Sequence, residues 1–144
     1  MANHIHFAEF RELGAEVVTV SRDTKFVHLA WQRDEKALAN VRYPMASDVT
    51  GEVARMFGVL DEKAGLTLRG TFIISPDGTL LNAEVNFFNL GRNVDELLRK
   101  VRANKHLAAH PSEGVPAQWK KSGDITLKPG PKLVGRVAEA MKKK

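Results

Sequence analysis

The 144-residue sequence contains no cysteine. This absence excludes disulfide bonds, thiolate metal ligands and any cysteine nucleophile within these residues. The sequence also lacks an apolar run near the ~18 residues that a bilayer span requires. Its first ten residues, MANHIHFAEF, do not have the charged and then apolar pattern of a signal peptide. A cytoplasmic location is therefore the default expectation.

Acidic residues are the minority, with 17 Asp and Glu against 22 Lys and Arg, so the formal net charge is +5. Such an excess can indicate a nucleic-acid partner. The basic residues are nevertheless spread along the chain, apart from Lys120-Lys121 and Lys142–Lys144, and no aromatic residues alternate with them. We expect a solvated basic surface, with neither a nucleic acid nor a membrane as partner. A salt-sensitive affinity for DNA or RNA would contradict this expectation.

The first part of the chain predicts a helix, a strand and a second helix. Apolar residues from about Ala2 to Leu13 have helical spacing, and Gly14 suits the end of that helix. The β-branched run Ala15–Ser21 predicts a buried parallel strand. Asp23 or Thr24 then caps a helix whose apolar face comprises Phe26, Val27, Ala30 and Trp31.

The middle of the chain carries the clearest local pattern. After a short extended segment at 43–45, a helix is expected from about Thr50, with Val53, Met56, Phe57 and Leu60 on its apolar face. Residues 71–75, the turn Pro76-Asp77-Gly78 and residues 80–88 predict a β-hairpin. A long helix follows, with Asn93 as its cap and Glu96 as the capping-box partner.

The composition changes after Ala109, because four of the six prolines fall in the last 34 residues. This change predicts two parts: a partial domain over 1–109 and an extended arm over 110–144, which a short basic helix closes. The order of elements before the arm predicts an α/β protein with the C-terminal part of a thioredoxin-like fold. That fold places a central strand between the 15–21 strand and the hairpin, and no segment here supplies it. Unpaired strand edges there would be costly, so we interpret the N-terminal and central strands as missing.

Several segments together resemble the peroxiredoxins, in particular the typical two-cysteine group of alkyl hydroperoxide reductase C and the thiol-specific antioxidant proteins. They are LGAEVVTVSRDTKFVHLAW at 13–31, GLTLRGTFIISPDG at 65–78, GRNVDELLRKVRA at 91–103 and HPSEGVPAQWKKSGDITLKP at 110–129. The similarity runs in order from about residue 7 to Arg136. It implies reduction of hydroperoxides by a peroxidatic cysteine, which family members carry upstream of the segment that matches this chain. It also implies a hydroperoxide substrate, a thiol reductant, no cofactor, and a homodimer or a ring of dimers.

Two positions acquire a meaning from this resemblance. Arg69 matches the arginine that stabilises the peroxidatic thiolate and the peroxide oxygen, a role that its planar, permanently charged donor fork suits. It could act only with the missing loop restored. The resolving cysteine of the family lies in a Pro-x-Glu-x-Cys-Pro-Ala-x-Trp context, and Val115 occupies that position here. Valine cannot form the intersubunit disulfide, so the chain as given is predicted to be inactive alone.

The histidines are the other candidates for chemistry. His4 and His6 alternate, and His106 and His110 have the i, i+4 spacing that can hold a metal on a helix. No third ligand lies nearby in the sequence, so we expect no metal site. His28, Trp31 and Trp119 are interpreted as packing residues.

Two interpretations of the missing segment stay open. In the first, Met1 follows a segment that was not read as coding sequence and that contains a cysteine or a selenocysteine. The in-frame TGA codon of a selenocysteine resembles a stop codon. In the second, the chain is a cysteine-free relative with a binding or assembly role, such as pairing with intact peroxiredoxin subunits or holding unfolded clients. The upstream DNA distinguishes them, and so does expression of the chain alone. A cooperatively melting product favours the second interpretation, and a molten or aggregating one the first.

Overall fold

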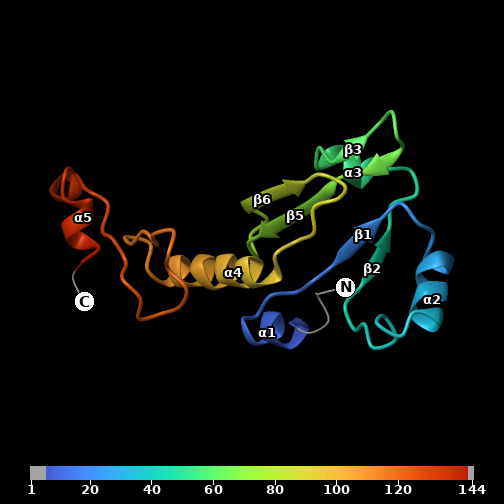
Figure 1. The fold of residues 1–144 in the computed structure, drawn as a ribbon, viewed down its shortest axis with the longest axis horizontal. Coiled ribbons are helices and arrows are strands. Elements are labelled where there is room, and N and C mark those ends of the chain that lie inside the picture. Colours follow the sequence, from blue (N-terminus) through green and yellow to red (C-terminus); the bar gives the residue numbers. More distant parts are fainter. Residues whose placement is uncertain (1–5, 143–144) are drawn as a thin grey trace. The chain divides into compact units, whose positions relative to one another are not determined.

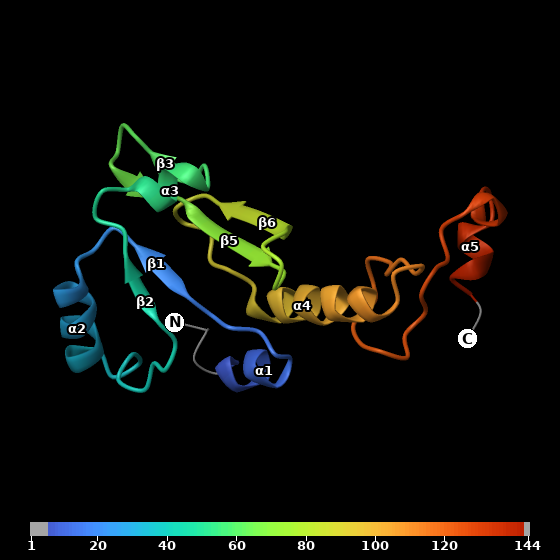
Figure 2. The same cartoon turned by 180° about the vertical axis from the view of Figure 1, so that it is seen from behind.

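A computed structural model describes residues 6–142 of the chain, as α-helices and short β-strands (Figures 1 and 2). The chain divides into two compact units, Met1–Val94 and Asp95–Lys144. The first unit contains α1 (Phe7–Glu12), β1 (Thr19–Ser21), α2 (Lys25–Asp34), β2 (Met45–Ser47), α3 (Glu52–Met56), β3 (Leu60–Asp61), β4 (Leu66–Thr67), β5 (Arg69–Ile74) and β6 (Leu80–Asn86). The second contains most of α4 (Val94–Ala109), η2 (Pro131–Leu133) and α5 (Val137–Ala140). The expected boundary at Ala109 stays a prediction.

The strands of the first unit form three two-stranded sheets: β1 with β2, β3 with β4, and β5 with β6. β1 and β2 are parallel, with Val20 opposite Ala46, and the other two pairs are antiparallel. β1 bonds to β2 and its flanking residues through Thr19 and Ser21. The Thr19 N–H donates to the Pro44 carbonyl at 3.0 Å, and the Ser21 carbonyl accepts from the Asp48 N–H at 2.8 Å. Since alternate residues of a strand face one neighbour, Val20 directs its backbone groups to the opposite edge. Within residues 6–142 no strand pairs with that edge.

Local sequence signals account for most element boundaries. The Thr24 hydroxyl accepts from the Val27 N–H at 3.3 Å and caps α2, as expected. Gly14 follows α1 with a φ of +74°, a conformation that suits glycine. The predicted hairpin is β5–β6, with Gly78 at φ +88° in its turn. α4 begins directly after Asn93, and the Glu96 carboxylate accepts two bonds from Arg99, at 2.6 and 2.9 Å.

Three sequence predictions about burial and boundaries are wrong. The 15–21 segment forms only a three-residue strand, and its valines are not buried, since Val18 is 57% exposed. The buried side chain of α2 is His28, whereas Phe26 of the expected apolar face is 71% exposed. α3 starts at Glu52, close to the expected start, but its buried residue is Ala54, while Met56 of the expected apolar face is exposed. Burial depends on which neighbouring element lies over a face. In the α3 segment, for example, Phe57 of the expected face packs against the Phe72 ring of β5.

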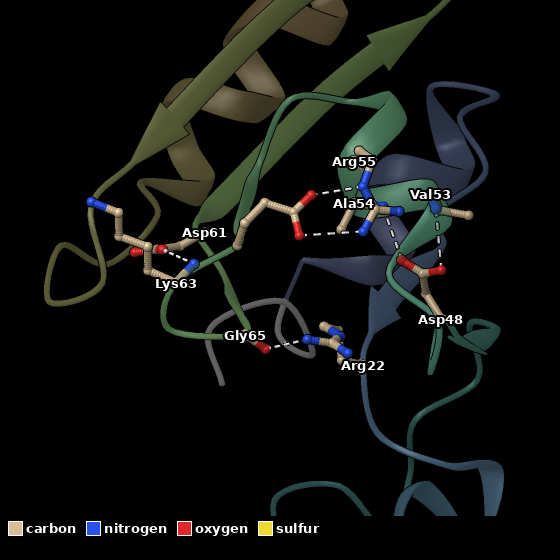
Figure 3. Close-up of polar contacts among 9 residues, drawn as sticks. Arg22, Asp48, Val53, Ala54, Arg55, Asp61, Lys63 and Gly65 are labelled. Carbon is tan, nitrogen blue, oxygen red and sulfur yellow. Dashed lines mark hydrogen bonds and ion pairs between the residues drawn. The ribbon is translucent and has the colours of Figure 1, made fainter.

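A polar framework holds the α3 region of the first unit together (Figure 3). The Asp48 carboxylate accepts from the backbone N–H groups of Val53 and Ala54, at 3.1 and 2.8 Å, and so caps α3 in place of Gly51, which has no side chain. These backbone bonds, chiefly that of Ala54, lower the pKa of Asp48. The Arg22 guanidinium donates to the carbonyls of Gly65 and Val49 and thereby ties the end of β1 to two loops.

Candidate functional site

Arg69 is the first residue of β5 and lies opposite Asn86, the last residue of β6. Its Nε–H donates to the Phe88 carbonyl at 2.6 Å, just beyond the end of β6. Among the described residues this is the one hydrogen bond that the Arg69 side chain makes. Because a guanidinium carries five N–H donors in a fixed plane, this bond orients the fork and leaves its terminal nitrogens available.

A second arginine, Arg92, lies beside Arg69, and sequence reasoning missed it. Its Nε–H donates to the Thr71 hydroxyl and its Nη2 to the Gly70 carbonyl, both at 2.8 Å. Although the residue is exposed as a whole, its guanidinium lies against β5. This desolvation, followed by the charge of Arg69, lowers the pKa of Arg92. Two cations therefore gather at the start of β5, where an anion would be stabilised.

The backbone at Gly70, which follows Arg69 and accepts a bond from Arg92, is closely packed. A Cβ on Gly70 would lie 2.7 Å from a ring carbon of Phe72 and 2.9 Å from Cγ1 of Val59. Both distances are below van der Waals contact, so a larger residue here would displace the Phe72 ring or the Val59 side chain. The Phe72 ring in turn lies 4.6 Å from that of Phe57, at the end of α3. β5 is thus packed against the α3 region close to its first residue, Arg69.

Val115 lies in the second unit, in a segment that the structure fixes on both sides. Gly114 forms an antiparallel bridge with Leu127, through bonds of 2.7 and 2.9 Å. On the other side, the Trp119 N–H donates to the Pro116 carbonyl at 3.0 Å. The half-buried Val115 side chain supplies only carbon atoms, so this position offers neither a nucleophile nor a proton donor. Arg69 and Val115 belong to different units, and each geometry stands by itself.

The histidines are engaged in hydrogen bonds. His106 Nε2 lies 2.9 Å from a Glu113 carboxylate oxygen, and His110 Nδ1 lies 2.9 Å from the His106 carbonyl. The two rings stack with centroids 4.3 Å apart. His6 pairs with Glu9 at 2.6 Å, and His4 lies outside the described residues. Within residues 6–142 no group of three or more His, Cys, Asp or Glu side chains could hold a metal ion.

The aromatic packing residues differ from one another. Trp119 is 2% exposed and His28 is 5% exposed, whereas Trp31 is 42% exposed and contacts the His28 ring with centroids 5.8 Å apart. The Ser21 hydroxyl donates to Asp23 at 2.9 Å and lies 2.7 Å from His28 Nε2.

None of the described helices is long and apolar enough to cross a membrane.

The fold and the paired arginines define an α/β protein with a cationic site at the start of a hairpin strand. Comparisons identify its class. Residues 3–83 match the AhpC/TSA family. Alkyl hydroperoxide reductase C of Staphylococcus epidermidis is 43% identical over 131 residues, which are 91% of this chain and 69% of that protein. The Escherichia coli K12 protein of the same name is 40% identical over 132 residues, or 92% and 70% of the two chains.

Solved structures agree with the sequence relatives. The crystal structure of Enterococcus faecalis AhpC is 41% identical, with a TM-score of 0.75 over 78% of this chain and 67% of that one. The reduced 2-Cys peroxiredoxin of Plasmodium vivax is 28% identical, with a TM-score of 0.87 over 95% and 72%. The chain belongs to the AhpC/TSA family, the peroxiredoxins, and has their thioredoxin-like fold. The resemblance inferred from the sequence is thereby confirmed.

Proposed function

We propose that this chain takes part in the thiol-dependent reduction of hydrogen peroxide and alkyl hydroperoxides, and that these 144 residues alone do not turn peroxide over. The observation that carries the proposal is the combination of an oriented Arg69 with the absence of any thiol. Membership of the family supplies the reaction class. The location that we propose is the cytoplasm, where a thiol reductant is available.

The reaction needs a thiolate that these residues do not supply. A thiolate sulfur attacks the terminal peroxide oxygen, the O–O bond breaks, and the alkoxide or hydroxide leaves and takes a proton. The sulfur is oxidised by two electrons to a sulfenic acid, and the peroxide is reduced to an alcohol or water. A cation near the sulfur favours the thiolate, and donors aimed at the oxygens stabilise the charge that develops on them.

Arg69 is suited to both tasks. Its Nε is held by Phe88, so the terminal nitrogens can donate in one plane to the sulfur and the peroxide oxygen together. Arg92 adds positive charge beside it without competing for Phe88, because its own donors go to Thr71 and Gly70. A peroxidatic cysteine or selenocysteine would have to come from an additional segment. With Val115 at the resolving position, the resulting sulfenic or selenenic acid would be reduced by an external thiol.

The test is peroxide consumption by the purified 144-residue chain with dithiothreitol as reductant. We expect no loss of hydrogen peroxide beyond that in buffer with dithiothreitol. A Val115→Cys chain is the matched control, because it adds one thiol in the arm. We expect from it only the slow reaction of an ordinary cysteine. Catalytic turnover by the unmodified chain would overturn the proposal.

A second candidate function is binding or assembly, and the exposed apolar side chains of the first unit favour it. Phe26, Leu29 and Trp31 on α2 and Val18 beside β1 are all more than 40% exposed, and the outer edge of β1 has no strand beside it in the described part of the chain. Such surface suits an interface with another polypeptide. The partner that we propose is a second copy or an intact peroxiredoxin subunit, in a dimer or a ring of dimers. Light scattering of the chain, alone and mixed with S. epidermidis alkyl hydroperoxide reductase C, tests this. A chain that scatters as a monomer alone and adds no mass to the S. epidermidis protein when mixed with it would contradict the proposal.

A further inference from the structure

One face of α4 meets the arm in the second unit. Arg99, Ala103 and His106 are spaced at i, i+4 and i+7, so they lie on the same side of the helix, and His110 directly follows its last residue, Ala109. Trp119 packs against this face: its ring centroid is 5.3 Å from that of His106, and its carbonyl accepts from Arg99 Nη1 at 3.1 Å. Ala103 and Trp119 are both buried, which makes the contact between arm and helix a packed one.

A single carboxylate fastens the start of the arm to the same face. Glu113 lies 2.9 Å from His106 Nε2, and its carboxylate also accepts from the Thr126 side chain. The side chains of His106 and Glu113 are only 11% and 19% exposed. Glu113 immediately precedes Gly114, which is bridged to Leu127. Glu113 therefore joins three parts of the second unit: α4, the outgoing segment of the arm and its returning segment.

We propose that Glu113 holds the arm closed over α4, in an arrangement that we call the clasp, and that protonation of the Glu113 carboxylate opens this clasp. The closed clasp buries Trp119 and holds the 113–119 segment, which includes Val115, against the helix. Protonation gives a neutral carboxyl group with one O–H donor and one remaining acceptor oxygen, so it removes the charge from both contacts and turns one acceptor oxygen into a donor. The clasp does not depend on the proposed function.

The charges of the two histidines near Glu113 both favour the ionised form of its carboxylate. The titratable groups that act on Glu113 are His106 on α4 and the stacked His110, which directly follows α4, and Thr126 contributes an uncharged hydroxyl. Arg99, at the Trp119 end of the clasp, is already paired with Glu96. Lys120 and Lys121, beyond Trp119, donate their backbone N–H groups to Asp124 and close a separate turn.

The pH dependence follows from these contacts. The hydrogen bond from His106, and after it that from Thr126, lowers the pKa of Glu113. A carboxyl group whose pKa is lower in the closed state favours closure fully above its ordinary pKa of about 4.3. This contribution is lost as the pH falls through the lower value of the closed state. The clasp is therefore closed at neutral pH and opens in acid.

The experiment measures hydrogen exchange of the Gly114 and Leu127 amides at pH 7, where no acid unfolding intervenes. Glu113→Gln imitates the protonated carboxyl group. We expect about tenfold faster exchange of both amides, because a bond to a charged group is replaced by one to a neutral group. Glu62→Gln makes the same change at an exposed ion pair of the first unit and should leave both amides unaffected. The hairpin amide of Ser75 is the internal reference in every sample.

A second measurement follows opening directly. Trp31→Phe leaves Trp119 as the one tryptophan, and acrylamide quenching then reports its exposure. We expect weak quenching at pH 7, a several-fold increase in acid, and strong quenching already at pH 7 when Glu113→Gln is added. His106→Gln should have the effect of Glu113→Gln, and the two together should add little more. Unchanged Gly114 and Leu127 exchange in Glu113→Gln would overturn the proposal, as would an acid transition of Trp119 that persists in that variant.

Discussion

α2 and α4 have similar apolar content but differ in what covers them. On α4, Leu98 is 1% exposed and Ala103 is buried, and the arm returns to the helix through Trp119. On α2, Phe26 is 71% exposed and Leu29 and Trp31 are 42% exposed, and His28 is the buried residue. The difference shows that helical spacing predicts which side chains share a face, while a second element decides whether that face becomes core.

The variants Leu98→Ala and Leu29→Ala test this comparison most strongly, because they remove the same side-chain atoms from α4 and from α2. We expect Leu98→Ala to lower the free energy of unfolding by about 2–5 kcal/mol, as removal of a buried leucine leaves a cavity. Leu29→Ala should cost less than about 1 kcal/mol, because water already reaches much of that side chain. Urea unfolding followed by far-UV circular dichroism measures both. Equal losses would show that α2 is covered in solution.

Thr24 tests whether the exposed helix still depends on its local cap. Thr24→Ala removes the hydroxyl that accepts from Val27, and we expect a loss of about 1 kcal/mol. Thr24→Ser keeps the hydroxyl and should retain most of the stability. The same urea titration measures both variants. If serine and alanine are equally destabilising, the cap contributes nothing and the β-branched methyl group accounts for the loss.

The Arg55–Glu62 pair should give the smallest effect. Arg55 Nε lies 2.7 Å from Glu62, but the two side chains are 54% and 62% exposed. Water and salt screen such pairs, so Glu62→Gln should melt within error of the unmodified chain in thermal unfolding at pH 7 and about 0.15 M salt. A clear drop in the melting temperature would mean that this pair is shielded from water in solution.

Local chemistry made part of the fold predictable. The Pro76-Asp77-Gly78 turn between alternating strands predicted the hairpin, and Thr24 predicted the start of α2. These features depend on residues within a few positions of each other. The burial of α2 was not predictable, since it depends on which element lies over the helix. The two-residue strands β3 and β4 were too short to leave a periodic pattern.

The residues of the candidate site also differ in whether the sequence could reveal them. Arg69 was found through resemblance to the family, since an arginine at a strand entrance has no distinguishing local pattern. Arg92 was missed because its contacts join residues 21 and 22 positions apart, to Thr71 and Gly70. An arginine just before the helix cap at Asn93 was the available signal, and its meaning appears only once the hairpin is formed. Val115 was recognisable because its neighbours from Pro111 to Trp119 form a complete motif around it.

Hydrogen exchange across the two helices tests most directly the claim that cover, and not composition, distinguishes them. The comparison uses the unmodified chain at pH 7, with the interior amides of α2 and those of α4 between Leu98 and His106. The structure predicts at least roughly tenfold stronger protection in α4, because its amides lie under a packed face and those of α2 do not. Equal protection of the two helices would contradict the account.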